Sequence, residues 1–338
     1  MPLGTILVAD DSEDSRELLS HLLVSEGYRV ICAEDGAQAL GAFATQPIDL
    51  ALLDVMMPHH TGFAVRRVVK AQPETRFIPV VLVTGLTSSG DRIQGIESGA
   101  DDFLNKPIRK EELLARVRSL VRLKRFTDEL ESAETVLCSL ALSIEAKDPD
   151  TEGHCDRLAH YSVLLAKHLG LPEEQRVALR RAGIVHDIGK VVVPERILLK
   201  PGPLDPEERR IIETRPVVGE RICSPLRTFR LVLPIIRHHH ERLDGTGYPD
   251  RLRGSEIPLT ARILQIVDIY DALTTKRPYR KALLPKEAFR ILREEVQKGW
   301  WDGALVDHLE KLLATSLPAS ATPAPPGANC SSSIPPAA

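Results

Sequence analysis

Several features that would assign this chain to other classes of protein are missing from its sequence. The five cysteines are scattered and odd in number, and no CxxC pair occurs, which argues against a cysteine-based zinc site and for a reducing compartment. No apolar run approaches the roughly 18 residues of a membrane-spanning helix. The N-terminal segment lacks a basic stretch followed by an apolar one, so no secretory signal is predicted. The formal net charge of −3 gives no indication of a nucleic-acid-binding surface. We therefore expect a cytoplasmic protein that binds neither nucleic acid nor membrane.

The 338 residues, 43% of them hydrophobic, suffice for two domains with cores of their own. In the N-terminal third, apolar runs alternate with amphipathic stretches, which is typical of βα repeats around a parallel sheet. The runs cover residues 5–11, 29–35, 49–55, 79–85 and 102–107. We expect an α/β domain with a doubly wound, five-stranded parallel sheet that binds ligands at the carboxyl ends of its strands.

A long connecting helix is predicted next, because residues 109–147 contain neither proline nor glycine. Leucine and isoleucine recur there every seven residues, and further apolar residues occupy the intervening heptad positions. This heptad seam consists of Leu123, Phe126, Leu130, Ala133, Leu137, Leu140 and Ile144. Two interpretations are open: the seam packs on the next domain, or it forms a parallel dimeric coiled coil that relays a signal.

The remaining sequence, as far as about residue 316, is predicted to form an all-α domain with polar loops around KPGPLDPEE and LDGTGYPDRLRGSEIP. The tail 317–338 is rich in proline, serine and alanine, and we expect it to be disordered.

Polar side chains follow the predicted strands of the first domain. They are Asp10 and Asp11 after the first strand, Asp54 after the third, Thr84 after the fourth and Lys106 after the fifth. Three carboxylates in one place repel each other unless a divalent cation joins them, and oxygen ligands suit Mg²⁺. A carboxylate beside Mg²⁺ and a lysine can accept a phosphoryl group, because both cations neutralise its charge. One such residue alone is most simply a strand-end cap, but the whole set predicts a phosphoryl-accepting site.

With the motifs VADD, LLDVMMP, LVTG and NKP, residues 1–122 resemble the flavodoxin-like receiver domain of two-component response regulators. The resemblance implies that a partner sensor histidine kinase phosphorylates Asp54. It assigns Mg²⁺ binding to Asp10, Asp11 and Asp54, phosphate contact to Lys106, and the switch positions to Thr84 and Phe103.

In the helical half, the stretch AGIVHDIGKVVVP places His186 and Asp187 at the end of an apolar run. Burying either group without a partner costs about 1–3 kcal/mol, so the pair either satisfies itself or binds something. The preceding helix is predicted to end at Gly189. The carbonyl end of a helix favours a nearby cation.

Further residues of the metal-ligand type lie elsewhere in this half. They are His154 after DPDTEG, His239 and His240 in RHHHERLDGTGYPD, and Asp268 and Asp271 in an apolar helical run. Singly, each is more simply a structural or solvent-exposed residue. Together, several histidines and aspartates without cysteine suit a hydrolytic Mn, Fe or Zn site, in which a shared aspartate bridges two metals that clamp a phosphoryl group.

Basic residues accompany this set. Lys190 stands three residues after Asp187, and Arg277 and Arg280 lie in TKRPYRK. Guanidinium groups form forked hydrogen bonds to phosphate. Taken alone, the two arginines indicate only a solvated basic turn.

Through HDIGK, HHERLDGTGYP and VDIYDALTTKRPYR, residues 130–316 resemble an HD-GYP domain, the cyclic di-GMP phosphodiesterase branch of the HD superfamily. The resemblance implies hydrolysis of cyclic di-GMP to the linear dinucleotide or to GMP at two divalent metals, with Fe or Mn expected. The implied metal ligands are His154, His186, Asp187, His239, His240 and Asp268. The implied catalytic pair is Asp187 and Lys190, and the substrate contacts are Lys190, Arg277 and Arg280. The signature loop that shapes the site contains Gly245, Gly247, Tyr248 and Pro249.

The sequence departs from this family pattern at Arg215. The family usually has a metal-ligand histidine there, before the proline, and a guanidinium cannot replace it because it offers only donors and stays charged. Two outcomes are open: a water fills the lost ligand position and activity survives, or one metal binds weakly and catalysis is impaired.

A second departure is Asp150, four residues before His154. Many family members have an aromatic residue there, and some have a glutamate that holds a third metal. Asp150 is either a shorter ligand for an extra metal or a helix-capping acid.

We therefore expect a response regulator in which phosphorylation of Asp54 shifts, through the 109–147 helix, the association or the opening of a metal-dependent cyclic di-GMP phosphodiesterase domain. Two alternatives stay open. Arg215 favours an impaired domain that senses nucleotide or binds a protein. An HD phosphohydrolase with another nucleotide substrate is the other, and the complete signature loop argues against it.

Overall fold

The computed structural model describes residues 2–85, 101–146, 153–276 and 281–316. The chain divides into two compact units, Met1–Ser132 and Ala133–Asn329, each with a core of its own. No helix in the described ranges combines the length and the apolar character that crossing a bilayer requires.

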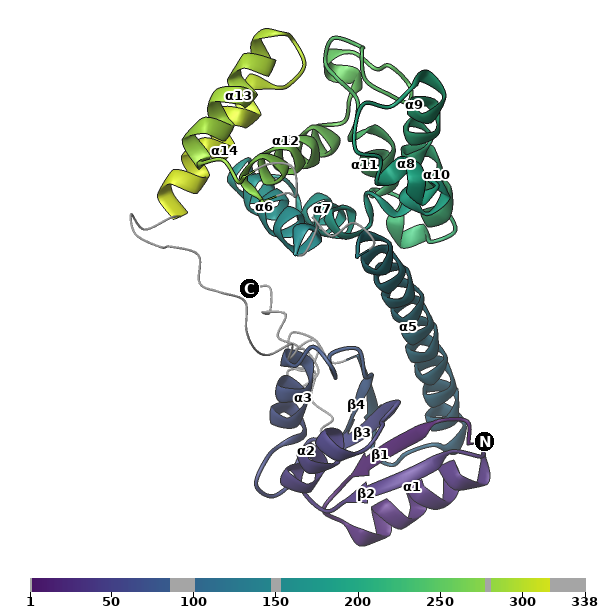
Figure 1. Ribbon diagram of the computed structural model, residues 1–338. Helices are drawn as coiled ribbons and strands as arrows, with labels where there is room; N and C mark the ends of the chain where they lie inside the picture. Colours follow the sequence, from purple (N-terminus) through teal and green to yellow (C-terminus); the bar gives the residue numbers. More distant parts are fainter. Residues whose placement is uncertain (1, 86–100, 147–152, 277–280, 317–338) are drawn as a thin grey trace. The chain divides into compact units, whose positions relative to one another are not determined.

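A five-stranded parallel sheet in the order β2-β1-β3-β4-β5 forms the centre of the first unit (Figure 1). Its strands are β1 (Thr5–Ala9), β2 (Arg29–Ala33), β3 (Leu50–Asp54), β4 (Val80–Thr84) and β5 (Asp102–Asn105). Strands β1 and β3 are buried along their whole length, as expected of parallel strands that helices cover on both faces. This strand order is that of flavodoxin-like sheets, so the fold predicted for this unit is confirmed.

Alternate residues of each strand point to opposite faces of the sheet and build two separate cores. On one face, Ile6 and Val8 pack with α1 and the start of α5; on the other, Leu7 and Leu53 pack with α2 and α3. These helices are α1 (Glu13–Ser25), α2 (Gly36–Thr45), α3 (Gly62–Ala71) and α5 (Lys110–Glu145). The packing fixes the carboxyl ends of the strands along one edge of the sheet, where the polar residues lie.

Helix α5 has 36 residues and is the predicted connecting helix. Its first turns belong to the core of the first unit through Leu113 and Val117, and its last turns belong to the core of the second unit through Leu137 and Ala141. Within the heptad seam, Leu137 is buried and Ile144 packs on the second core. The exposed members of the seam are Leu123, Phe126, Leu130, Ala133 and Leu140. Leu137 and Ile144 therefore serve packing within the chain, whereas the seam as far as Ala133, together with Leu140, is exposed at the helix surface.

The second unit is built from helices in the parts that the structure describes (Figure 1). Its α-helices are α6 (His154–His168), α7 (Glu173–Val185), α8 (Glu195–Leu198), α9 (Pro206–Glu213), α10 (Arg215–Cys223), α11 (Leu233–His238), α12 (Leu259–Thr274), α13 (Pro285–Gln297) and α14 (Gly303–Ser316). Short 3₁₀ segments are η1 (Ile188–Val192), η2 (Arg227–Phe229) and η3 (Gly254–Glu256). A single apolar core, which includes the fully buried Leu158, Leu179 and Ile266, joins α6, α7 and α12. The predicted all-α domain is thus confirmed.

The predicted end of one helix was wrong. Helix α7 ends at Val185 and not at Gly189, and the chain continues into η1. A Cβ atom on Gly189 would lie 2.0 Å from the carbonyl oxygen of Arg215, so η1 and α10 approach as closely as only glycine allows. The glycine serves this close approach, which depends on a segment far away in the sequence, and does not stop the helix.

Candidate functional site

Asp10, Asp54 and Lys106 meet at the carboxyl ends of β1, β3 and β5. Lys106 Nζ lies 2.8 Å from Asp10 Oδ2 and 2.6 Å from Asp54 Oδ2. One oxygen each from Asp10, Asp11 and Asp54 lie within 4.8 Å of one another, so these carboxylates could hold a metal ion. Burial lowers the pKa of the Lys106 ammonium, but its hydrogen bonds to Asp10 and Asp54 outweigh this and raise the pKa above its ordinary value. The sheet edge thus joins an acidic metal site to a lysine that stays charged.

The other two predicted receiver positions lie on the neighbouring strands. Thr84 ends β4, and its carbonyl oxygen accepts a 2.8 Å hydrogen bond from the backbone N–H of Lys106. Phe103 lies on β5 and packs, half-buried, against the core. Both residues are therefore placed beside the strand end that carries Lys106.

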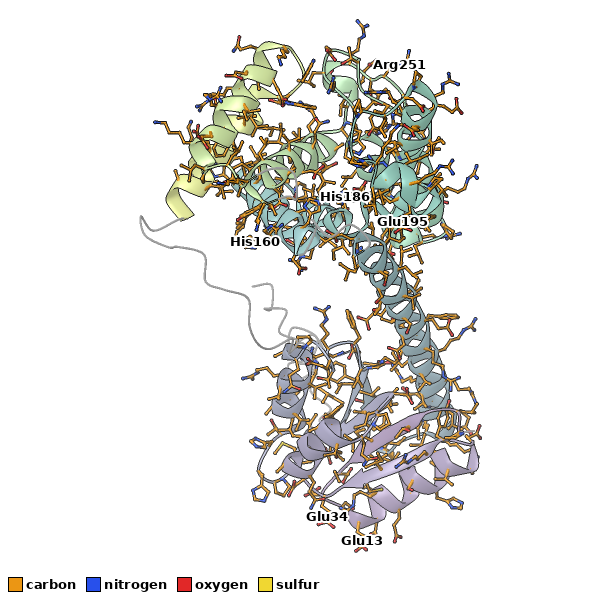
Figure 2. All side chains as sticks on the ribbon, in the orientation of Figure 1. Glu13, Glu34, His160, His186, Glu195 and Arg251 are labelled. Carbon is orange, nitrogen blue, oxygen red and sulfur yellow. The ribbon has the colours of Figure 1, made fainter. Side chains whose placement is uncertain are left out.

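Histidines and aspartates from separate segments of the second unit converge in its interior, where His186 lies among the helices (Figure 2). They are His154 at the start of α6, His186 and Asp187 directly after α7, His239 and His240 directly after α11, and Asp268 on α12. His154, His186 and His239 are no more than 7% exposed. The packing of α6, α7, α11 and α12 therefore brings together all the described residues that the sequence marked as ligands.

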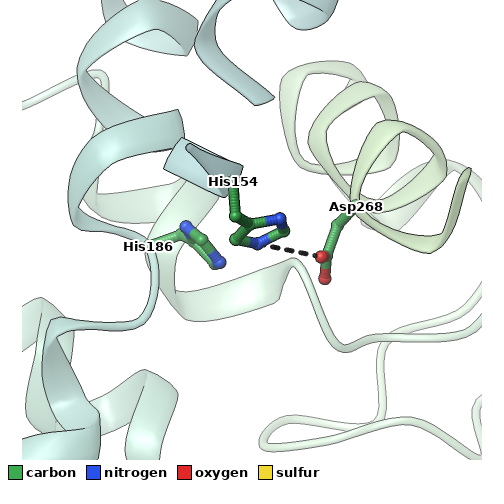
Figure 3. A group of neighbouring side chains, drawn as sticks. All are labelled: His154, His186 and Asp268. Carbon is green, nitrogen blue, oxygen red and sulfur yellow. Dashed lines mark ion pairs between the residues drawn. The ribbon is translucent and has the colours of Figure 1, made fainter. Parts of the chain in front are cut away.

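The first donor group consists of His154, His186 and Asp268, which approach one another from three different elements (Figure 3). One ligand atom from each lies within 4.8 Å of the others. His154 Nε2 is 3.5 Å from Asp268 Oδ1. Two imidazoles and a carboxylate at these separations suit a divalent transition metal.

The second donor group consists of Asp187, His239 and His240, whose ligand atoms also lie within 4.8 Å of one another. Asp187 faces both groups with different oxygens. Its Oδ2 lies 3.6 Å from Nε2 of His186, and its Oδ1 lies 4.0 Å from Nε2 of His239. Asp187 is therefore placed to bridge the two donor groups.

Hydrogen bonds orient two of the buried imidazoles. His186 Nδ1 lies 3.2 Å from the carbonyl oxygen of Gly183, and His239 Nδ1 lies 2.7 Å from that of Ile236. A carbonyl oxygen can only accept a hydrogen bond. Nδ1 of each imidazole must therefore carry the hydrogen, and Nε2 keeps its lone pair. Both Nε2 atoms are buried and have no hydrogen-bond partner among the described residues. Buried lone pairs turned toward carboxylates are the observation that a metal ion would explain.

His154 is oriented by a residue whose role the sequence did not reveal. Its Nδ1 lies 2.7 Å from Oδ2 of Asp271, whose Oδ1 accepts a 2.6 Å hydrogen bond from Arg157 Nε. Burial lowers the pKa of His154, but the hydrogen bond to Asp271 and the charges of the neighbouring carboxylates together outweigh it and raise the pKa. Asp271 follows Asp268 by one helical turn. In the sequence, only this spacing indicated that Asp271 lies beside the proposed ligands.

The remaining histidines of the two donor groups are held neutral. Burial lowers the pKa of His186 to about 4 and also lowers that of His239. Burial, together with the neighbouring His239 and the Arg215 charge, holds the pKa of His240 well below its usual value. Neutral imidazole is the form that binds metal.

Two cations contact Asp187. Lys190 Nζ lies 2.9 Å from its Oδ2, and Arg215 Nη1 lies 3.5 Å from its Oδ1. Burial raises the pKa of the Asp187 carboxyl, but Lys190 and Arg215 outweigh it and hold the pKa well below its usual value. Arg215 Nη2 also lies 3.3 Å from His240 Nε2 and 3.4 Å from the hydroxyl of Tyr248. The guanidinium is therefore inserted among residues of the second donor group.

The predicted signature loop packs directly on the second donor group. Tyr248 stacks on the His240 ring at a centroid distance of 4.9 Å. Gly245 has a φ of 79°, and a Cβ atom on Gly247 would lie 2.3 Å from a backbone nitrogen, so both positions require glycine. Pro249 follows Tyr248 and lines the neighbouring surface.

A buried glutamate that sequence reasoning missed holds the loop in place. Glu241 is fully buried, and its carboxylate accepts backbone hydrogen bonds from Asp250 (2.7 Å), Arg251 (3.0 Å) and Leu252 (3.2 Å). Gln265 Nε2 donates a 3.1 Å hydrogen bond to the carbonyl oxygen of His239. These supporting roles could not be predicted from the sequence, because nothing in the polar run around HHHERLDGTGYP distinguishes a buried glutamate from an exposed one.

Three predicted residues lie outside the described residues. They are Asp150, Arg277 and Arg280.

Comparison with known proteins gives two family matches. Residues 6–118 match the response regulator receiver domain, and residues 139–305 match the HD domain. HD domains are a metal-dependent hydrolase family and receiver domains bind Mg²⁺, which agrees with the donor groups in both units.

Several curated relatives share both parts. The cyclic di-GMP phosphodiesterase response regulator RpfG of Xanthomonas campestris is 35% identical over 82% of this chain and 79% of its own length. A probable cyclic di-GMP phosphodiesterase of Vibrio cholerae is 35% identical over 85% of this chain and 73% of its own length. A cyclic di-GMP phosphodiesterase of Thermotoga maritima is 33% identical over 85% of this chain and 84% of its own length. The chain therefore belongs to the family of response regulators that join a receiver domain to an HD domain.

Proposed function

We propose that this response regulator hydrolyses cyclic di-GMP in its HD domain under control of receiver phosphorylation. The observation that carries the proposal is the convergence of the unpartnered Nε2 atoms of His186 and His239 on the carboxylate of Asp187. Burying such atoms without a partner costs stability, which a bound metal would recover. The relatives that align with both domains carry the name cyclic di-GMP phosphodiesterase, and this supplies the substrate.

The donor set fits a divalent metal, and we assign the first donor group with Asp187 to one ion. The second donor group, which also includes Asp187, is a weaker position because the Arg215 guanidinium lies beside it. Histidine and carboxylate donors without cysteine suit Mn, Fe or Zn, and the resemblance to HD-GYP domains favours Fe²⁺ or Mn²⁺ among them. Such a metal, when bound, polarises a phosphoryl oxygen and lowers the pKa of a water.

Residues around the donor groups would bind the phosphates. Lys190, at 2.9 Å from Asp187, keeps that carboxylate ionised and in place, and brings positive charge to the phosphate. We assign Arg277 and Arg280 to further phosphate contacts. The expected product is the linear dinucleotide or GMP.

A cavity of about 250 Å³ beside the second donor group would receive part of the nucleotide. Its lining includes Tyr248, His240, Asp268 and Trp301. The lining also includes Arg209 and Arg242, and aromatic rings beside guanidinium groups suit a purine base attached to a phosphate.

In the receiver, Asp54 would accept the phosphoryl group from a sensor histidine kinase. Mg²⁺ would be held by Asp10, Asp11 and Asp54, whose oxygens lie within 4.8 Å of one another. Lys106 would bind the phosphate, and Thr84 and Phe103 would rearrange as switch residues. Such rearrangements commonly act on a bistable element next to the site.

We further propose that the exposed part of the α5 seam forms a homodimer that transmits this change. The exposed apolar residues Leu123, Phe126 and Leu130 recur at the spacing of a coiled coil. We take 1–122 as the receiver domain, 130–316 as the HD-GYP domain and 109–147 as the helix shared between them. A cytoplasmic location agrees with the four described cysteines, all of which are free.

The test is a direct assay of the full-length protein. It is purified without oxygen, loaded with Mn²⁺ or Fe²⁺, and incubated with cyclic di-GMP while products are separated by chromatography. We expect product formation that His186→Ala abolishes. The matched control is His160→Ala, because His160 lies exposed on α6, away from the donor groups.

Full activity of the His186→Ala variant would contradict the metal assignment. A lack of product from the metal-loaded wild-type chain would instead favour a nucleotide-binding module.

A further inference from the structure

Arg215 is held in place by its backbone and by its own side chain. It begins α10, and Gly189 packs so closely on its carbonyl oxygen that α10 cannot shift without breaking this contact. Its Nε donates a 3.2 Å hydrogen bond to the carbonyl oxygen of Ile212, and the side chain is only 12% exposed. The guanidinium is thus fixed in orientation and largely removed from water.

The atoms that the guanidinium contacts are those that a second metal would need. Nη1 lies 3.5 Å from Asp187 Oδ1, the oxygen that faces His239, and Nη2 lies 3.3 Å from His240 Nε2. A divalent cation bound by Asp187, His239 and His240 would therefore lie next to a positive charge. Coulomb repulsion at such separations is strong in a partly dry interior.

We propose that the Arg215 guanidinium serves as the second cation of the phosphodiesterase centre, an inference that rests on the proposed function. The protein then works with one divalent metal in the first donor group, and Arg215 binds a phosphate oxygen of the nucleotide where other sites of this kind use a second metal.

A guanidinium can perform part of the work of a metal ion. A second metal neutralises phosphate charge and positions the phosphoryl group. A planar, always charged guanidinium does both through forked hydrogen bonds. It cannot lower the pKa of a water as a metal does, so that role stays with the ion in the first donor group.

The present contacts of the guanidinium leave it available to phosphate. Its bonds to Asp187, His240 and Tyr248 are 3.3–3.5 Å long, at or beyond the limit of good hydrogen bonds. A phosphate would compete for the guanidinium through shorter, charge-assisted bonds, and the first-group metal and Lys190 would still neutralise Asp187. His240 and Tyr248, which Arg215 contacts, line the 250 Å³ cavity, so the guanidinium lies directly behind the cavity wall and would meet a phosphate that enters between these two side chains.

The first experiment counts metal ions, which needs no turnover. Full-length wild type, Arg215→His and Arg215→Lys are reconstituted with Mn²⁺ in excess Mg²⁺, which occupies the receiver site, and the Mn²⁺ content is analysed by elemental analysis and electron paramagnetic resonance. We expect about one Mn²⁺ per chain with the spectrum of an isolated ion in wild type and Arg215→Lys. In Arg215→His, which restores a neutral ligand, we expect about two ions and an exchange-coupled spectrum. The control is Arg196→Ala, an exposed arginine on α8, which should behave as wild type.

The second experiment measures the affinity of the Mn²⁺-loaded proteins for inorganic phosphate by calorimetry. We expect Arg215→Ala to weaken binding about tenfold or more, Arg215→Lys to recover part of the loss, and Arg196→Ala to leave it unchanged.

Two coupled Mn²⁺ ions per wild-type chain would overturn the proposal, and so would an unchanged phosphate affinity in a folded Arg215→Ala variant. Neither result depends on hydrolysis of cyclic di-GMP. A chain that shows the expected metal count and phosphate affinity but does not hydrolyse the dinucleotide would refute the proposed substrate and leave the role of Arg215 standing.

Discussion

His154 Nδ1 lies 2.7 Å from Asp271 Oδ2, and both side chains are buried. The carboxylate fixes the imidazole so that its other nitrogen, Nε2, faces Asp268 at 3.5 Å. Arg157 holds the other carboxylate oxygen at 2.6 Å. A donor of the first group is thus oriented by a chain of charged residues that do not themselves face the metal position.

The first prediction concerns this orienting carboxylate. Asp271→Asn keeps the shape of the side chain but removes its charge, so His154 becomes a poorer and less fixed ligand. We expect the dissociation constant for Mn²⁺ to rise roughly 10–100-fold, which calorimetry on the full-length protein would measure in excess Mg²⁺, so that the receiver site is already occupied. The control is Asp307→Asn on α14, an exposed aspartate, which should bind Mn²⁺ as wild type does. Equal affinity in Asp271→Asn and wild type would refute the orienting role.

The second prediction concerns pH. Burial lowers the pKa of His186 to about 4 in the folded protein, against about 6.5 when it is unfolded. Between these values the unfolded chain binds more protons, so stability is lost as the pH falls from about 6.5 to about 4. We expect the metal-free HD domain to lose about 2 kcal/mol at pH 5 from this residue alone. His239 and His240 act in the same direction, and His154, whose pKa is raised, opposes them in part.

Urea unfolding at pH 7 and pH 5, followed by tryptophan fluorescence, measures this loss. Both tryptophans of the chain, Trp300 and Trp301, belong to the HD domain and report on it alone. His186→Leu should reduce the pH dependence, whereas the exposed His160→Ala should leave it unchanged. If the unfolding midpoint is the same at both pH values, the imidazoles are not held neutral by burial.

The third prediction concerns the receiver. Lys106 is the cation that bridges Asp10 and Asp54, so Lys106→Met leaves the carboxylates facing each other. We expect a loss of about 1–2 kcal/mol in chelator, recovered largely by millimolar Mg²⁺, because a divalent cation replaces the lost charge. Calorimetric melting with and without Mg²⁺ measures both the loss of stability and its recovery. The exposed Lys110→Met is the control, and a Lys106→Met variant that Mg²⁺ does not stabilise more than wild type would contradict the prediction.

The sequence predicted the elements whose signals are local. Apolar runs located every strand of the receiver sheet, and their polar ends located Asp10, Asp54 and Lys106, because parallel strands end at a common edge. The histidines that we propose as ligands were likewise visible as polar residues within or beside apolar runs. His186 and His239 indeed prove to be buried.

The relationships that the sequence could not predict are those between distant segments. Gly189 was expected to stop a helix, whereas it permits close packing on Arg215, which is specified only by the fold. Asp271 and Glu241 support the site through contacts that no local pattern reveals. The sequence showed that Arg215 stands where a ligand histidine is expected, but only the structure shows which atoms its guanidinium contacts.

The last prediction concerns the exposed part of the α5 seam. Leu130 is 46% exposed, and Leu130→Glu places a charge in the middle of the proposed dimer contact. We expect its dimer dissociation constant, measured by analytical ultracentrifugation with beryllofluoride and Mg²⁺, to rise at least about 100-fold, since a buried charge without a partner is costly. Leu142→Glu is the matched control, because Leu142 is 47% exposed on the opposite face of the same helix. If both variants dimerise equally well, the seam is not the dimer contact, and its role is to pack against the core of the HD domain through Leu137.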